Sequence, residues 1–228
     1  MSSSITRRLP IAADVQPGGG THFRVWAPRP KQVALVIHDA PGDREVPLER
    51  EADGYYSAYV ADATAGTRYR YRLDGQLFAD PASRHQPEGP FGPSEVVDAG
   101  TYTWRHASPR RTPLGAQVIY EMHIGTFTAE GTWAAAMERL PGLAEIGITT
   151  LEVMPVSEFP GRFGWGYDGV FPFAPTRLYG SPDDFRAFID AAHELGLWVI
   201  LDVVYNHLGP HGCVFAQYGS EHFSKDYP

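Results

Sequence analysis

The sequence lacks several features that whole classes of protein require. It holds a single cysteine, Cys213, so no disulfide can form within the chain, and no Cys/His spacing indicates a structural zinc site. No apolar run is long enough to span a bilayer, and the N-terminus has no hydrophobic segment typical of a secretory signal. Lys and Arg number 19 against 27 Asp and Glu, a net charge of −8, which argues against a nucleic-acid partner. We therefore expect a cytoplasmic enzyme or binding protein with no membrane or nucleic-acid partner.

The first hundred residues contain short alternating runs separated by turn signals. The clearest run is residues 68–73, in which Tyr69, Tyr71 and Leu73 alternate with three arginines, and Asp74-Gly75 closes it as a hairpin. Further strands are expected at 22–27, 33–37, 55–60, 76–79 and 95–97. This spacing predicts a β-sandwich of about 100 residues. It would serve either as a packing module or as a carbohydrate-binding module. The proline-rich residues 80–94 are expected to form an ordered surface loop.

The second half alternates between strand and helix patterns. Strands are expected at 117–122, 149–156 and 197–204, the last buried on both faces with helices on both sides of the sheet. One helix begins at Thr132, kinks at Pro141 and stops at Gly147. The other is capped by Ser181, with Pro182 and Asp184 in its first turn, and ends at Gly196. Its expected buried stripe is Phe185, Phe188, Ile189, Ala192 and Leu195. The order predicts a parallel α/β fold. A barrel and a doubly wound sheet both stay open, although the absence of a Gly-x-Gly-x-x-Gly disfavours a dinucleotide fold.

Polar and aromatic side chains follow each of these strands, where a barrel places its functional groups. The three clusters are Glu121, His123, Gly125 and Thr126; the loop 163–169 with Trp165, Tyr167 and Asp168; and Asp202, Tyr205, Asn206 and His207. The glycine-flanked Trp165 and Tyr167 either stack on a ligand or plug the barrel mouth. Asp202 is either a structural carboxylate or a substrate contact. A metal held by His207 and His211 is disfavoured, because Gly209 and Pro210 interrupt any helix between them.

Several motifs together resemble the α-amylase superfamily, glycoside hydrolase family thirteen. The first signature region of that family, Asp-x-x-x-Asn-His, is matched by residues 202–207, and its stacking-tyrosine motif by Gly166-Tyr167. Within the family, residues 120–128, 163–169, 80–84 and 92–98 are similar to the maltooligosyl trehalose trehalohydrolases. The resemblance implies an immunoglobulin-like sandwich of the early-set type followed by the first three strands of a (β/α)₈ TIM barrel, incomplete in this chain. The expected divisions are 1–104 for the sandwich, 105–116 for a connector and 117–228 for the partial barrel.

The resemblance also implies a function. Enzymes of this subgroup release trehalose from maltooligosyl trehalose with a retaining mechanism. Tyr167, His207, Trp165 and Asp168 would contact the α-glucan, and Asp202 and Asn206 would support the site. No metal and no cofactor are expected. A branching or debranching enzyme, or a truncated glucan-binding protein, remain the alternatives.

The same resemblance locates the catalytic carboxylates outside this sequence. In the family they follow later strands of the barrel, so the nucleophile and the general acid are expected beyond Pro228 and no catalytic residue is assigned here. We therefore expect the chain to be part of a longer enzyme and to be inactive without the rest of the barrel.

Overall fold

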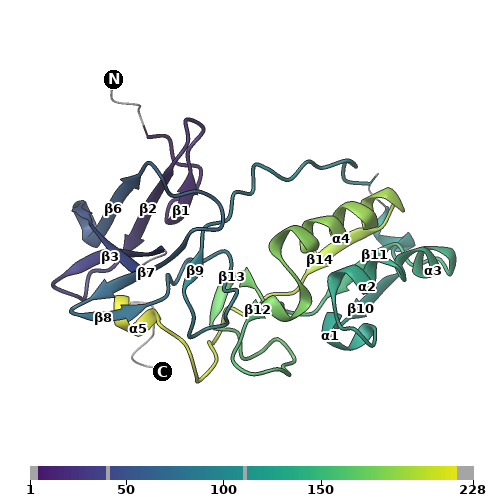
Figure 1. Cartoon of the computed structure of the whole chain (residues 1–228). Coiled ribbons are helices and arrows are strands. Elements are labelled where there is room, and N and C mark those ends of the chain that lie inside the picture. Colours follow the sequence, from purple (N-terminus) through teal and green to yellow (C-terminus); the bar gives the residue numbers. More distant parts are fainter. Residues whose placement is uncertain (1–4, 40–41, 110–111, 220–228) are drawn as a thin grey trace.

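The computed structural model describes residues 5–39, 42–109 and 112–219, and its first part consists of two antiparallel sheets (Figure 1). One sheet has the order β1-β2-β6-β5, and the other has the order β4-β3-β7-β8 with β9 also paired to β7. The strands are β1 (Ala12–Val15), β2 (Thr21–Trp26), β3 (Val33–Asp39), β4 (Gly42–Pro47), β5 (Glu49–Arg50), β6 (Tyr55–Val60), β7 (Arg68–Leu73), β8 (Gln76–Phe78) and β9 (Ser94–Glu95). A 3₁₀ turn, Ala52–Gly54, precedes β6. The inward faces of both sheets share one hydrophobic core, as a sandwich requires.

Strand β7 confirms the alternation expected from the sequence. Tyr69, Tyr71 and Leu73 are buried in the shared core, while the three arginines that alternate with them are only half-buried. The turn that follows has positive φ angles at both central residues, 44° at Asp74 and 91° at Gly75. Two consecutive positive φ angles define the type I′ turn that suits the twist of a two-residue hairpin. The local sequence therefore determined this hairpin.

Two features of the first part differ from the expectations. Strands β1, β4 and β5 were not expected, and β4 is polar and largely exposed, so it carries no strong alternation. Residues 80–94 are ordered but largely buried, and the expectation of a surface loop is wrong: Asp80, Ser83 and Gln86 have no exposed surface. Several of their polar groups are bonded within the segment: Gln86 Nε2 donates to Ser94 Oγ at 3.2 Å, and the Asp80 amide donates to the same oxygen at 3.0 Å.

The second part is built on a parallel sheet of order β10-β11-β14. Its elements are β10 (Ile119–Met122), α1 (Ile124–Phe127), α2 (Trp133–Met137), α3 (Leu140–Glu145), β11 (Thr150–Val153), α4 (Pro182–Glu194) and β14 (Trp198–Leu201). The segment between β11 and α4 contains a small antiparallel pair, β12 (Ser157–Glu158) and β13 (Phe171–Pro175), and a 3₁₀ turn, Arg177–Tyr179. Another 3₁₀ turn, Leu114–Ala116, precedes β10. Within the described ranges, no helix combines the length and the apolar character needed to cross a membrane.

In the part of the chain that the structure describes, helices cover one face of the sheet and not the other, so the expectation of helices on both sides is wrong. Helices α2 and α4 pack on each other, with Trp133 and Phe185 stacked at a centroid distance of 4.3 Å. They cover the face that carries Leu151 and its register partner Val199. On the other face Ile200 is 43% exposed, and the strand ends at Leu201 rather than at residue 204. Each new strand of this sheet is added beside the previous one, always toward the same edge. Because crossovers between parallel strands are right-handed, both connecting helices then lie on the same face of the sheet.

The helix signals were partly confirmed. Ser181 and Asp184 form a complete capping box at the start of α4, and Phe188 and Ala192 are fully buried. Leu195 lies beyond the last helical turn and is 38% exposed, contrary to the expected stripe. The predicted kink near Pro141 is a break between α2 and α3, and the proline stands in the first turn of α3, where its missing amide proton costs no hydrogen bond.

The α/β part has a hydrophobic cluster of its own, but it also contributes side chains to the core of the sandwich. Residues from the second half join the sandwich core: Val170, Phe171, Ala174, Val214 and Tyr218. The last of these lies on a short helix, α5 (Phe215–Tyr218), which Figure 1 shows in yellow next to β8. The Tyr218 hydroxyl donates to the carbonyl of Ala79 at 2.8 Å, and the Arg29 amide donates to the carbonyl of Tyr218 at 3.1 Å. The chain thus returns to the sandwich after β14.

Candidate functional site

The three clusters expected from the sequence meet at the carboxyl edge of the parallel sheet. Residue 123 follows β10, the loop 162–169 follows β11 and β12, and residues 202–209 follow β14. Each outer segment is hydrogen-bonded to the central loop. We call the assembly of His123, residues 162–169 and residues 202–209 the strand-end site.

His123 holds the first half of the loop. Its Nε2 lies 2.9 Å from the carbonyl oxygen of Gly164, and because a carbonyl only accepts, Nε2 is the donor. Its Nδ1 lies 3.1 Å from the hydroxyl oxygen of Thr126. The Tyr179 hydroxyl lies 3.2 Å from the same Nε2, and burial, with the nearby carboxylate of Glu158, raises the pKa of Tyr179 to about 12, so it stays neutral.

His207 holds the second half in the same way. Its Nε2 donates to the carbonyl oxygen of Tyr167 at 2.8 Å, and its Nδ1 lies 3.2 Å from Oδ1 of Asn206. The amide of Gly209 also donates to the carbonyl of Gly169 at 3.1 Å. Two histidines from different strand ends therefore hold the loop by its backbone carbonyls. The side chain of Tyr167 takes no part in these two hydrogen bonds.

Glycines let the loop pass close to its neighbours. Gly166 has a φ of 95°, and a Cβ placed on it would lie 2.3 Å from the carbonyl oxygen of Pro155. Gly209 leaves no room either, since a Cβ there would lie 2.2 Å from the carbonyl oxygen of Asp168. No side chain fits at these distances. The close approach of the loop to Pro155, and of the segment after β14 to Asp168, therefore depends on glycine at both positions.

The loop presents its aromatic rings to solvent. Phe163 is 87% exposed, Trp165 74% and Tyr167 46%, far above the values of core aromatic residues. Beside them lies a hollow of about 400 Å³, lined by His123, Gly125, Thr126, Arg162, Phe163, Gly164, Trp165, Asp168 and Tyr179. The expectation that Trp165 and Tyr167 are exposed is confirmed for the described part of the chain. Such rings offer flat apolar faces next to polar groups, which is the surface that a sugar ring matches.

The remaining predicted residues have different surroundings. The Asp202 amide donates to the carbonyl of Val153 at 2.9 Å and so continues the sheet ladder, while its carboxylate has no hydrogen-bond partner among the described residues. Glu121 lies on the uncovered face of the sheet, away from the helices, and is exposed. Over the described ranges, no group of three or more His, Cys, Asp or Glu side chains is placed to hold a metal, and this includes His207 and His211.

The expected position of the catalytic carboxylates lies outside the described residues. The nucleophile and the general acid were expected beyond Pro228, and Pro228 itself lies outside the described residues, which extend to Gly219. That expectation therefore stays a prediction. The same holds for the expected end of the partial barrel at Pro228, because residues 220–228 also lie outside the described part of the chain.

Sequence reasoning missed the buried ion pair beneath the loop. Glu158 has no exposed surface and accepts from the amide of Arg177 at 2.8 Å and from the guanidinium of the same residue. Burial raises the pKa of the Glu158 carboxyl, and the contacts with Arg177 oppose that shift. The pair ties β12 to the turn before α4 and thereby fixes the base of the aromatic loop. The two residues are 19 positions apart, and no local pattern links them.

Comparison with known proteins bears on this site. The family described as "Alpha amylase, catalytic domain" matches residues 82–227, and "Carbohydrate-binding module 48 (Isoamylase N-terminal domain)" matches residues 10–85. The chain is 44% identical over 218 residues to a malto-oligosyltrehalose trehalohydrolase of Deinococcus radiodurans and 43% identical over 209 residues to one of Saccharolobus solfataricus. These alignments cover 95% and 91% of this chain but only 36% of each relative.

A solved structure from Salmonella typhimurium, provisionally classed as an alpha amylase, is also similar. It superposes with a TM-score of 0.89 at 45% identity, over 97% of this chain and 37% of that one. The catalytic-domain match alone spans more than half of the 228 residues and includes the whole strand-end site. The chain therefore belongs to the alpha-amylase family, with a carbohydrate-binding module 48 preceding its catalytic-domain residues.

Proposed function

We propose that this chain supplies the sandwich and the first barrel strands of a glycosidase that releases trehalose from maltooligosyl trehalose. The observation that carries the proposal is the strand-end site, where two histidines clamp a loop that presents Trp165 and Tyr167 beside a hollow. The names of the two relatives support this substrate over other α-glucans. The chain spans about a third of the length of these two relatives, so trehalose release is proposed for this protein on the strength of the site.

The winding of the sheet supports a barrel over a doubly wound sheet. Strands β10, β11 and β14 succeed one another in one direction, and both crossover helices lie on one face. A doubly wound sheet reverses its strand order and places helices on both faces. In a (β/α)₈ barrel the helices form an outer ring, so the uncovered face would line the barrel interior.

Each site residue has a role in this proposal. Tyr167 and Trp165 stack on sugar rings, and Asp168, at the edge of the hollow, accepts hydrogen bonds from sugar hydroxyls. His207 reaches a sugar hydroxyl from its Nδ1 side, where its present partner is the exposed amide of Asn206. Asn206 and Asp202 support the segment that carries His207. The partner of the site is thus a neutral α-glucan, with maltooligosyl trehalose as substrate.

The chemistry of the proposed reaction needs two carboxyl groups. Retaining glycosidases place a nucleophile and a general acid about 5–5.5 Å apart across the scissile bond. We assign neither role to a residue of this chain, and the proposal keeps both beyond Pro228. Asp168 belongs to substrate binding, and Asp202 belongs to loop support, which at present it gives through its backbone amide, bonded to the carbonyl of Val153 at the end of β11.

The test uses the protein purified from its own source, with maltotriosyl trehalose and amylose as separate substrates. We expect free trehalose from the first, and a loss in kcat/KM of about 10- to 100-fold in Tyr167→Ala, because one stacked ring contributes about 1–3 kcal/mol in comparable stacking. Tyr59→Ala, which removes a half-exposed tyrosine of the sandwich, is the matched control. New α-1,6 branches in amylose, or linear chains released from amylopectin as a third, branched substrate, without trehalose, would instead identify a branching or debranching enzyme.

A further inference from the structure

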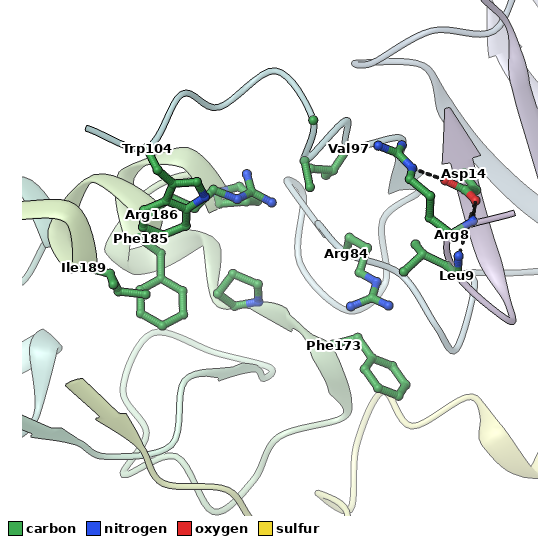
Figure 2. Close-up of a pocket in the computed structure, with 14 residues that line it drawn as sticks. Arg8, Leu9, Asp14, Arg84, Val97, Trp104, Phe173, Phe185, Arg186 and Ile189 are labelled. Atoms are coloured by element: carbon green, nitrogen blue, oxygen red, sulfur yellow. Dashed lines mark hydrogen bonds and ion pairs between the residues drawn. The ribbon is translucent and has the colours of Figure 1, made fainter. Parts of the chain in front are cut away.

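A second hollow lies where the sandwich meets the α/β part, away from the strand-end site. We call it the junction groove (Figure 2). Its volume is about 490 Å³, within the range of about 300–1,000 Å³ that small-molecule sites occupy, and junctions between domains are a common place for such sites. Leu9, Asp14 and Arg84 line it from the sandwich side, and Trp104 and Phe185 from the side of α4.

Aromatic rings form the apolar part of the groove. Trp104 is 49% exposed and Phe173 44%, whereas Phe185 in the same groove is half-buried. Trp104 is held in place: its ring meets that of Tyr102 edge to face at 5.0 Å. The next two backbone amides, those of Arg105 and His106, donate to the fully buried carboxylate of Asp190. The Trp104 ring is therefore exposed on a segment whose backbone is held in place.

The arginines around the groove are not equivalent. Arg8 is paired with Asp14 at 3.2 Å and with Asp98 at 3.4 Å, and Arg186 is paired with Asp183. Arg84 has no ion pair and no hydrogen bond from its guanidinium among the described residues. Its Nε is closed off from solvent, so the terminal nitrogens of the guanidinium are the donors that a ligand in the groove could meet. Its guanidinium lies over the ring of Phe173, 5.1 Å from the centroid. An unpartnered donor beside an exposed ring is a feature that a ligand acceptor would complete.

These observations discriminate between classes of ligand. A phosphate or another strong anion is typically held by several free cationic donors, but carboxylates already neutralise two of the three arginines. A purely apolar ligand would leave Arg84 unsatisfied. A neutral sugar chain suits both features, since its C–H faces pack on aromatic rings and its hydroxyls accept from a guanidinium.

We propose that the junction groove is a second α-glucan site, in which Trp104 and Phe173 contact sugar rings and Arg84 donates to their hydroxyls. The substrate class rests on the proposed function, but the site is distinct from the strand-end site. The two matched families meet in the groove, because Asp14 falls in the carbohydrate-binding module and Trp104 and Phe173 fall in the catalytic-domain match. The groove would hold a distal part of a long glucan while the strand-end site holds its reacting end.

The test measures binding of maltoheptaose to the full chain by titration calorimetry, beside trehalose release by the protein from its own source. We expect two classes of binding site in the wild type. Trp104→Ala and Arg84→Gln each weaken one class about tenfold, and Trp165→Ala weakens only the other. Phe91→Ala, an exposed sandwich aromatic that does not line the groove, is the matched control and leaves both classes intact. Trp104→Phe, which keeps an aromatic face, restores binding.

The outcomes separate this inference from the proposed function. A single class of sites that is lost in Trp165→Ala and unchanged in Trp104→Ala and Arg84→Gln overturns the second site, even if trehalose is released. Binding that depends on Trp104 in a protein that releases no trehalose supports the groove and contradicts the proposed reaction. If the wild type binds no maltoheptaose in the groove, the glucan assignment is wrong. Circular dichroism of each variant establishes that a loss of binding is not a loss of fold.

Discussion

The buried carboxyl of Asp80 makes the stability of the sandwich depend on pH. Asp80 has no exposed surface, and burial raises its pKa from 3.8 to about 6 against the opposing hydrogen bonds from Tyr69 at 2.7 Å and from the Ala82 amide at 2.8 Å. The charges of Arg84 and Arg7 also oppose the shift, but less. The folded protein therefore binds the Asp80 proton more tightly than the unfolded chain does.

The sign and size of the effect follow from linkage. A raised pKa in the folded state adds stability that is fully present below the unfolded pKa of about 3.9 and is lost as the pH rises through about 6. Since one pKa unit corresponds to about 1.36 kcal/mol and the shift is about two units, the loss is about 3 kcal/mol. Asp80→Asn keeps a polar group of the same shape that does not titrate, so it removes this dependence.

Urea unfolding followed by tryptophan fluorescence, from about pH 4 to about pH 7.5, measures the effect. Other titrating groups contribute equally to both proteins, so the difference in unfolding free energy between wild type and Asp80→Asn isolates Asp80. We expect this difference to shift by about 3 kcal/mol against the wild type as the pH rises. Asp62→Asn, which alters a carboxylate that is 72% exposed, should reproduce the wild-type profile. Parallel profiles for wild type and Asp80→Asn would refute the reasoning.

Three further substitutions test the described contacts. Gly166→Ala forces a Cβ to within 2.3 Å of the Pro155 carbonyl at a positive φ, and we expect a loss of about 2–5 kcal/mol in urea unfolding; a loss below about 1 kcal/mol would contradict the described loop. Trp133→Ala removes a fully buried ring, so the midpoint of unfolding should fall by the equivalent of about 3–5 kcal/mol, and an unchanged midpoint would argue against the stacking on α4. Burial would raise the pKa of Asp190, but hydrogen bonds from Arg105 and the backbone hold it at about 2. Asp190→Asn should therefore cost about 1.5–3 kcal/mol at neutral pH, a difference that disappears as the pH falls from about 4 through about 2; a cost that does not vary with pH would sink this account.

The elements that the sequence predicted are those whose signal lies within a few residues. The alternation of Tyr69 and Tyr71 and the capping box of Ser181 and Asp184 depend on neighbours along the chain, and both were confirmed. The exposure of Ile200 could not be predicted in this way. It depends on which side of the sheet the two crossover helices occupy, and an apolar strand looks the same in either case.

The candidate site shows the same division. The strand ends indicated which clusters share one edge of the sheet, and the structure brings them together as expected. The particular contacts join atoms far apart in sequence: His123 and Gly164 are 41 positions apart, and His207 and Tyr167 are 40 apart. Both bonds end on a backbone carbonyl, which every residue has, so no side-chain pattern identifies the partner. The ion pair of Glu158 with Arg177 could not be predicted from the sequence, because the pairing of β12 with β13 is what brings the two residues together.

The return of α5 to the sandwich has a consequence for synthesis on the ribosome. Tyr218, which donates to the carbonyl of Ala79, lies 139 residues further along the chain. Ribosomes add about 5–20 residues per second, so about 7 to 28 s pass between the synthesis of Ala79 and that of Tyr218, which completes the sandwich core. During that interval the apolar residues that α5 later covers remain accessible to a chaperone. The first hundred residues therefore reach their final packing only after most of the α/β part has been made.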